Sequence, residues 1–183
     1  MSHRLPGRAM ILFWLACALT CTASSAMADD DFSRLKLSRA GAGTALPPFE
    51  LSTVDGKVIE FSQLRGKVII LNFWATWCGP CKEEMPALDR LSRRFDARDV
   101  AVLTITTEHE RTGIQRFMKQ FDSALPVLLD EQRDVSLAFM VRGLPTTVFI
   151  AKNGTVVGRA VGPREWDGPD AVRFIEGLRQ DTP

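Results

Sequence analysis

The stretch Trp77-Cys78-Gly79-Pro80-Cys81 follows the apolar run Val68–Trp74 and precedes a charged, amphipathic run that begins at Lys82. This order predicts a strand, then two closely spaced cysteines, then a helix. A cysteine at the start of a helix faces unpaired backbone N–H groups and the positive end of the helix dipole, which favour its thiolate. Thiolates attack disulfides. We therefore expect Cys78 to be a nucleophile and Cys81, one turn along, to open or close a disulfide with it.

The first 28 residues have the features of a targeting segment. Arg4 and Arg8 supply positive charge, Ala9–Ala23 is uncharged and largely apolar, and Ala26-Met27-Ala28 is a small-x-small cleavage site. The apolar run is shorter than the roughly 20 residues that a membrane helix needs. We expect a cleaved signal peptide over residues 1–28, with an uncleaved anchor as the alternative. Either reading exports the rest of the chain, and we expect it in the periplasm.

The composition excludes several classes of protein. The 183 residues are 45% hydrophobic and 25% charged, which is typical of one globular domain. The leader holds two of the 23 basic residues and none of the 22 acidic ones, so the remainder is nearly neutral and nucleic acid is not an expected partner. The leader also holds two of the four cysteines. The remaining Cys78–Cys81 pair closes too small a loop to stabilise much, so it serves reactivity or metal binding.

The hydrophobic pattern predicts an α/β domain over residues 46–183, after a mobile linker over residues 29–45 that contains at most a short helical turn. A β-hairpin is expected around the turn at Asp55-Gly56, and a short helical turn at residues 62–66. Strands are expected at Val68–Trp74, Ala101–Thr106, Leu125–Leu129, Thr146–Ile150 and Val156–Val161, and helices at Gly79–Phe95, around Ile114–Phe121, at Val135–Val141 and around Ala171–Leu178. Strands that alternate with helices predict a sheet with parallel pairs, and the hairpin at Asn153-Gly154 makes it mixed.

Glu84 is an unusual position for a carboxylate. At 100° per residue it shares the apolar stripe of its helix with Leu88 and Leu91, one turn from Cys81. Burial would raise the pKa of this carboxyl, which could then take or give the proton of Cys81. The alternative is a surface acid that a kink at Pro86 turns outward.

Two further features flank the cysteines. Trp77 is either a packing residue or, next to the nucleophile, a shield for the sulfur and a contact surface. Gly143-Leu144-Pro145-Thr146 precedes a strand; it is either an ordinary loop or a site where a proline without an N–H leaves room for an extended partner chain. We expect no bound metal, because zinc usually takes four ligands and His109 is expected at the surface. A Cu(I) ion, which accepts two or three ligands, is the alternative.

The run Phe73–Cys81 together with Leu144-Pro145-Thr146 resembles the thioredoxin superfamily, from about Leu46 to Leu178. The resemblance is greatest to the exported TlpA/ResA-type branch, which adds a central helix and strand, here about Glu108–Leu129, and carries Glu84-Met85-Pro86. It implies a thioredoxin-like fold, a cis peptide at Pro145 beside the sulfurs, and client contacts at these residues: Trp77, Gly79, Pro80, Leu144, Pro145 and Thr146. Cytosolic thioredoxins have Asp where this chain has Asn72, and Glu84 is the branch's usual substitute.

The resemblance also implies a function. Gly79-Pro80 is the dipeptide of thioredoxin, so we expect a disulfide reductase, without a cofactor, that is re-reduced by a membrane electron donor. Its expected clients are disulfide-containing proteins of cytochrome c or copper-centre assembly, although Pro145-Thr146 departs from the Pro-Glu of dedicated cytochrome c maturation proteins. We expect a monomer. The alternatives are a Cu(I) metallochaperone and a disulfide-donating oxidant. A peroxiredoxin is excluded, because its motif needs proline and threonine where this chain has Leu71 and Ala75.

Overall fold

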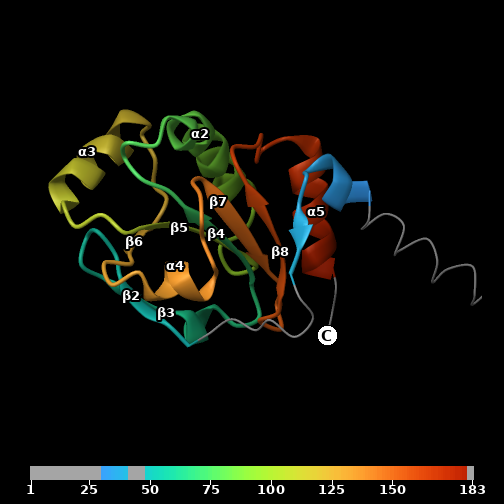
Figure 1. Cartoon of the computed structure of the whole chain (residues 1–183). Helices are drawn as coiled ribbons and strands as arrows, with labels where there is room; N and C mark the ends of the chain where they lie inside the picture. Colours follow the sequence, from blue (N-terminus) through green and yellow to red (C-terminus); the bar gives the residue numbers. More distant parts are fainter. Residues whose placement is uncertain (1–29, 41–47, 181–183) are drawn as a thin grey trace, which may run out of the picture.

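A six-stranded mixed sheet forms the centre of the molecule, with helices on both faces (Figure 1). The computed structural model describes residues 30–40 and 48–180; the expected signal peptide and the expected start of the domain at Leu46 lie outside these residues. The strand order is β1-β8-β7-β4-β5-β6. The bounds are β1 Ser38–Arg39, β4 Val68–Phe73, β5 Val100–Thr106, β6 Val127–Leu129, β7 Thr146–Ile150 and β8 Val156–Val161. A separate antiparallel hairpin joins β2 Glu50–Ser52 to β3 Val58–Glu60.

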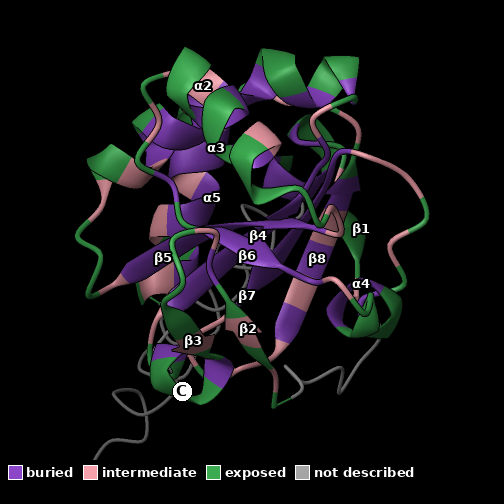
Figure 2. Cartoon of the chain, turned by 90° about the vertical axis from the view of Figure 1, so that its left-hand side faces the viewer, coloured by how far each residue is buried: buried purple, intermediate pink, exposed green. Residues whose placement is uncertain are grey.

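Alternate residues of β4 point to opposite faces of the sheet, and each face has its own core. Val68 and Ile70 pack with α2 (Gly79–Arg94), α3 (Arg111–Gln120) and α5 (Pro169–Gln180). Ile69, Leu71 and Phe73 pack on the other side with the 3-10 helix η1 (Phe61–Leu64) and α4 (Asp134–Ala138). Every residue of β4, β5 and β7 is buried, as the central strands of Figure 2 show. This explains why their sequences are apolar runs without strict alternation.

The structure confirms the predicted α/β fold and the type of each predicted helix and strand from the β2–β3 hairpin onwards. Pairs β4–β5 and β5–β6 are parallel, while β7 and β8 run antiparallel to their neighbours, so the sheet is mixed as expected. The predicted turns at Gly56 and Gly154 have φ of 87° and 84°, values that favour glycine. Among the described residues, no helix combines the length and the apolar character that crossing a bilayer requires.

The expected linker is different from the prediction over its described part. Residues 30–34 form a short helix, and Phe32 and Leu35 are buried in the same core as α5. The chain then pairs as β1 with β8, Ser38 opposite Arg159. The prediction of a mobile linker was wrong for residues 30–39, because two apolar side chains three residues apart bury one helical face against the domain. Residues 41–45 lie outside the described part.

Candidate active site

Cys78 and Cys81 form a disulfide at the head of α2, with an S–S distance of 2.04 Å. Cys78 is the N-cap residue of the helix, and its sulfur accepts a hydrogen bond from the Cys81 N–H at 3.3 Å. Pro80 lies in the first turn, where its missing N–H leaves no bond unmade. Cys78 is 5% exposed and Cys81 is fully buried, so an incoming molecule meets Cys78 first. The predicted order of attack is consistent with this geometry.

The surface around Cys78 is formed by its exposed neighbours in the sequence. Trp77 is 74% exposed, and Gly79 and Pro80 are exposed as well. Such exposure excludes the packing role that was one alternative for Trp77. A large apolar ring that stands in solvent beside a reactive sulfur is suited to contact a partner protein.

The Leu144–Pro145 peptide bond is cis, as the resemblance implied. The Pro145 carbonyl accepts from the Gly162 N–H, and the Thr146 hydroxyl donates to the Gly143 carbonyl. The paired part of β7 begins at Thr146, so the main chain of Leu144 lies beyond the ladder. Leu144 and Trp77 line the same cleft of about 320 Å³. The proline loop (residues 143–145) and the cysteine loop (residues 74–78) therefore lie side by side.

Glu84 is buried, with an exposure of 3%, so the alternative of a surface acid was wrong. Its Oε1 accepts from Asn72 Nδ2 at 2.7 Å, and its Oε2 accepts from Trp166 Nε1 at 2.8 Å and from the Arg164 N–H at 3.2 Å. Burial raises the pKa of Glu84 above its ordinary value of 4.5, against the opposing effect of these hydrogen bonds. The carboxyl can therefore exchange a proton closer to neutral pH than an exposed glutamate.

Asn72 is suited to both protonation states of Glu84. Its Nδ2 donates to Glu84 and, at 3.0 Å, to the Thr147 hydroxyl, while its buried Oδ1 has no hydrogen-bond partner. A half-turn of the amide would present Oδ1 to a protonated Glu84, which then donates instead of accepting. An aspartate in this place would add a second buried carboxyl that competes for the same proton.

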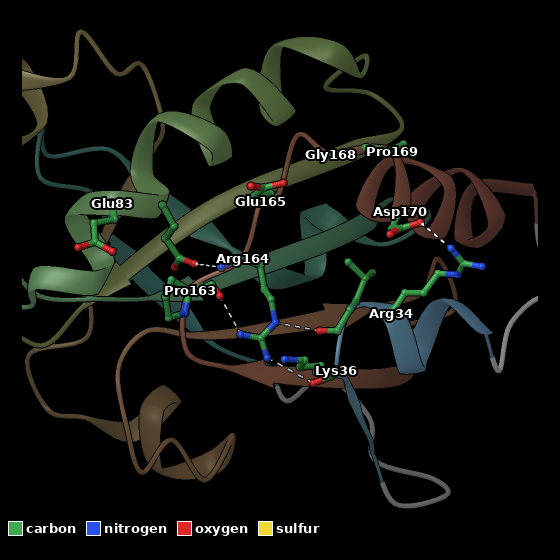
Figure 3. A pocket seen from close by; sticks show the side chains of 11 residues that line it. Arg34, Lys36, Glu83, Pro163, Arg164, Glu165, Gly168, Pro169 and Asp170 are labelled. Atoms are coloured by element: carbon green, nitrogen blue, oxygen red, sulfur yellow. Dashed lines mark hydrogen bonds and ion pairs between the residues drawn. The ribbon is translucent and has the colours of Figure 1, made fainter.

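A second cleft, of about 630 Å³, is lined by Glu84 and shares no lining residue with the cleft at Trp77 and Leu144. Arg164 lines it as well. Figure 3 shows Arg164 between the loop after β8 and the N-terminal segment, which comprises residues 30–39. The Arg164 guanidinium donates to the carbonyls of Leu35 and Lys36 at 2.9 and 3.5 Å, while its main-chain N–H holds Glu84. The N-terminal segment is thus connected to the buried carboxyl through one residue.

Several supporting residues were not predicted from the sequence. Trp166 and Arg164 hold Glu84 from about 80 positions away, a contact that no local pattern reveals. Glu108 accepts from the N–H and hydroxyl of Thr76 at 2.7 and 2.6 Å, which fixes the loop before Cys78 to the end of β5. The predicted site residues cluster as two groups: the cysteines with Trp77 and the loop that carries Pro145, and Glu84 with its own cleft.

His109 lies at the surface, as expected, and its Nδ1 is 3.8 Å from Glu131. Among the residues that the structure describes, no cluster of three or more histidine, cysteine or carboxylate side chains is arranged to hold a metal ion. A two-thiolate Cu(I) site at the reduced cysteines stays a hypothesis, which metal retention by the reduced protein would test.

Comparison with known proteins gives one consistent group of relatives. Residues 42–159 match the sequence model of the AhpC/TSA family. The thiol-disulfide oxidoreductase ResA of Bacillus subtilis (strain 168) is 36% identical over 160 residues, which cover 87% of this chain and 86% of ResA. ResA of Geobacillus thermodenitrificans is 35% identical over 154 residues, covering 84% of this chain and 85% of the relative.

Comparison with solved structures gives proteins of the same kind as these relatives. A thiol:disulfide interchange protein of the thioredoxin family from Chlorobium tepidum TLS superposes with a TM-score of 0.68 at 29% identity, covering 76% of this chain and 99% of that one. The exposed lipoprotein thioredoxin Etrx1 of Streptococcus pneumoniae gives a TM-score of 0.59 at 34% identity, covering 66% and 93%.

Proposed function

Since this chain belongs to the AhpC/TSA family of the thioredoxin superfamily and is a thiol–disulfide oxidoreductase, we propose that it reduces disulfides of exported client proteins. The observation that carries the proposal is the Cys78–Cys81 disulfide at the head of α2, with the buried carboxyl of Glu84 one turn beyond it. The two cysteines are the redox centre, and the structure represents the oxidised end of its cycle.

In the proposed cycle the Cys78 thiolate attacks one sulfur of the client disulfide. A Cys78–client mixed disulfide forms, and the other client sulfur leaves as a thiolate that takes a proton from water. Glu84 then accepts the proton of Cys81, and the Cys81 thiolate attacks Cys78. The second client sulfur leaves as a thiolate and takes the proton that Glu84 accepted. The client has then gained two electrons and two protons, and the enzyme holds the disulfide seen here.

The residues of the client-facing loops support contact with a protein substrate. Trp77 offers an exposed apolar ring, and the main chain of Leu144 lies at the end of the β7 ladder, where an extended chain can pair. The Gly79-Pro80 dipeptide, by its resemblance to thioredoxin, supports the reducing direction. Clients from cytochrome c or copper-centre assembly, and a membrane thiol reductant that restores the dithiol, complete the proposal.

The equilibrium reduction potential of the Cys78–Cys81 pair tests the direction of electron flow. We expect a value close to that of thioredoxin, about −270 mV, measured against glutathione or a thioredoxin reference. A value near that of the strong oxidant DsbA, about −120 mV, would contradict reduction and assign the protein to disulfide donation.

The proposed periplasmic location depends on the leader. The pattern at Ala26-Met27-Ala28 predicts a mature chain that begins at Asp29, which the mass of the protein recovered from a periplasmic fraction would show. A full-length mass in the membrane fraction would support the anchor instead, and a full-length mass in the cytoplasm would contradict export.

A further inference from the structure

We propose that the client segment recognised beside the cysteines is acidic, and that Arg133, Arg142 and Arg159 select it. The inference rests on the proposed function and names the chemistry of its substrate. It comes from two clefts that flank the proline loop and from the charges that line them.

The two clefts form one continuous surface. The first, of about 320 Å³, is bounded by Trp77 and Leu144 and also by Arg133 and Arg142. The second, of about 380 Å³, also borders Gly143 and is lined by Arg142 and Arg159. Arg142 and Gly143 line both clefts, so a chain that extends across the proline loop from Trp77 passes all three arginines.

The charge of this surface is not balanced. No aspartate or glutamate of the described part of the chain lines either cleft. Arg133 and Arg142 are exposed, and within the described chain no hydrogen bond or ion pair engages either guanidinium. The Arg159 guanidinium donates, among the residues that the structure describes, only to the Met140 carbonyl, at 3.4 Å.

No ion pair joins a carboxylate of the described chain to any of these arginines. Asp130 is buried and accepts from the Val135 and Ser136 N–H groups at the head of α4. Asp134, next to Arg133 in the sequence, lines a separate cleft beside β2. The cleft on the Glu84 side, by contrast, is lined by Glu83, Glu165 and Asp170 as well as by basic residues.

Exposed apolar side chains accompany the positive charge. Met140 and Val161 are 57% and 58% exposed, and both line the second cleft. The surface therefore fits an extended segment in which carboxylates alternate with aliphatic side chains around a cysteine. Arginine binds carboxylates in a planar, bidentate fashion, and unpaired charges at a rim increase the association rate, an effect that salt screens.

The test uses three disulfide-linked peptides that differ only in two residues beside the cysteine: Glu, Gln or Lys. The reduced full-length protein is mixed with each, and the second-order rate constant of peptide reduction is measured at low and at high salt. We expect the Glu peptide to react about tenfold faster than the Lys peptide at low salt, with the Gln peptide between them. The difference should shrink as salt is added.

Charge reversal assigns the effect to this surface. Arg142→Glu and Arg133→Glu should each reduce or invert the Glu-to-Lys ratio, whereas Arg65→Glu should leave it unchanged. Arg65 is exposed and lies before β4, at the end of the sheet opposite to the cysteines. Because the ratio is taken within one protein preparation, the concentration of active protein cancels from it.

The outcomes separate this inference from the proposed function. Equal rates for the three peptides, or a ratio that Arg65→Glu changes as much as Arg142→Glu, overturn the acidic preference and leave the reductase intact. A reduced protein that reduces none of the peptides contradicts the reductase, and the inference fails with it.

Discussion

Glu84 receives three hydrogen bonds, and all three come from N–H groups. Such a site suits a carboxylate, yet burial raises its pKa. Proton acceptance needs the carboxylate form, so the rate at which Cys81 resolves a mixed disulfide should rise with pH through the raised pKa of Glu84. We expect Glu84→Gln to lose this rise and to slow resolution by roughly 10²-fold. Stopped-flow measurement of single-turnover resolution from pH 5 to 9 would show it.

The matched control for that variant is Glu83→Gln. Glu83 is the preceding residue of α2 and is exposed, so its neutralisation changes the charge of the same helix turn without touching the buried group. A glutamine at 84 can be accommodated, since a half-turn of Asn72 presents its free Oδ1 to the new amide. If both variants keep the wild-type pH profile, Glu84 has no role in proton transfer.

At the residue scale, the sequence predicts the burial or exposure of a residue where this follows from its local neighbours. The burial of Glu84 follows from its place on the apolar stripe of one helix, and the exposure of Trp77 from its place beside the nucleophile. Trp166 could not be predicted, because a tryptophan 82 positions away becomes a partner only after β8 and α5 have packed. Glu108 joins the site by the same kind of distant contact, across the ends of two strands.

At the element scale, the N-terminal segment over residues 30–39 is held by side-chain packing and by backbone pairing. The Phe32 ring lies edge-on to Phe174 at 5.3 Å, and β1 pairs with β8. A Cβ on Gly158 would lie 2.8 Å from the Phe32 ring and 3.0 Å from the Ser38 carbonyl. Gly158→Ala should therefore displace the segment and lower the free energy of unfolding by about 1–3 kcal/mol. Urea unfolding and limited proteolysis after Arg34 or Lys36 would report the change.

Gly177→Ala is the matched control, because Gly177 is exposed within α5 and a Cβ there would meet nothing within 4 Å. It should stabilise the protein by up to about 1 kcal/mol.

Arg164 joins the N-terminal segment to Glu84, so Gly158→Ala should also shift the pH profile of mixed-disulfide resolution. A Gly158→Ala protein as stable and as protease-resistant as the wild type would show that the segment does not dock.

The sequence gives uneven information about these elements. The central strands are long apolar runs and α2 has a clear stripe, so both could be predicted. Strand β1 has two residues, both exposed, and nothing in its sequence distinguishes it from a loop. A short helical turn is allowed for this segment, but Phe32 and Leu35 could not show that it docks on the domain, because no local pattern tells what covers them.

At the scale of the whole molecule, residues on the two faces of the sheet have different roles: one face carries Asn72 of the active site, and the other carries a purely apolar part of β4. On β4, Asn72 points to the side of α2 with Ile70, while Leu71 and Phe73 face α4. Thr147 of β7 meets Asn72 from the adjacent strand. The mixed character of the sheet could be predicted from the order of strands and helices, but the position of β7 beside β4 could not, because loop length permits several strand orders.

The same buried carboxyl should affect the stability of the whole oxidised protein. Because the pKa of Glu84 is higher in the folded state than its ordinary 4.5, the folded state binds this proton more tightly. Its contribution to stability is therefore complete below pH 4.5 and is lost as pH rises through the folded-state pKa. Asp96 acts in the opposite direction: hydrogen bonds from Arg98 lower its pKa to about 2, so its contribution is lost as pH falls from 3.8 through 2.

Between pH 4.5 and 8, the range in which Asp96 stays ionised, the wild type should lose stability relative to Glu84→Gln as pH rises. Glu83→Gln should follow the wild type, since it removes an exposed charge and leaves the buried one. Urea unfolding of the three oxidised proteins at a series of pH values would measure the difference. Parallel curves for the wild type and Glu84→Gln would mean that the folded and unfolded states bind this proton equally, which a carboxyl with 3% exposure should not allow.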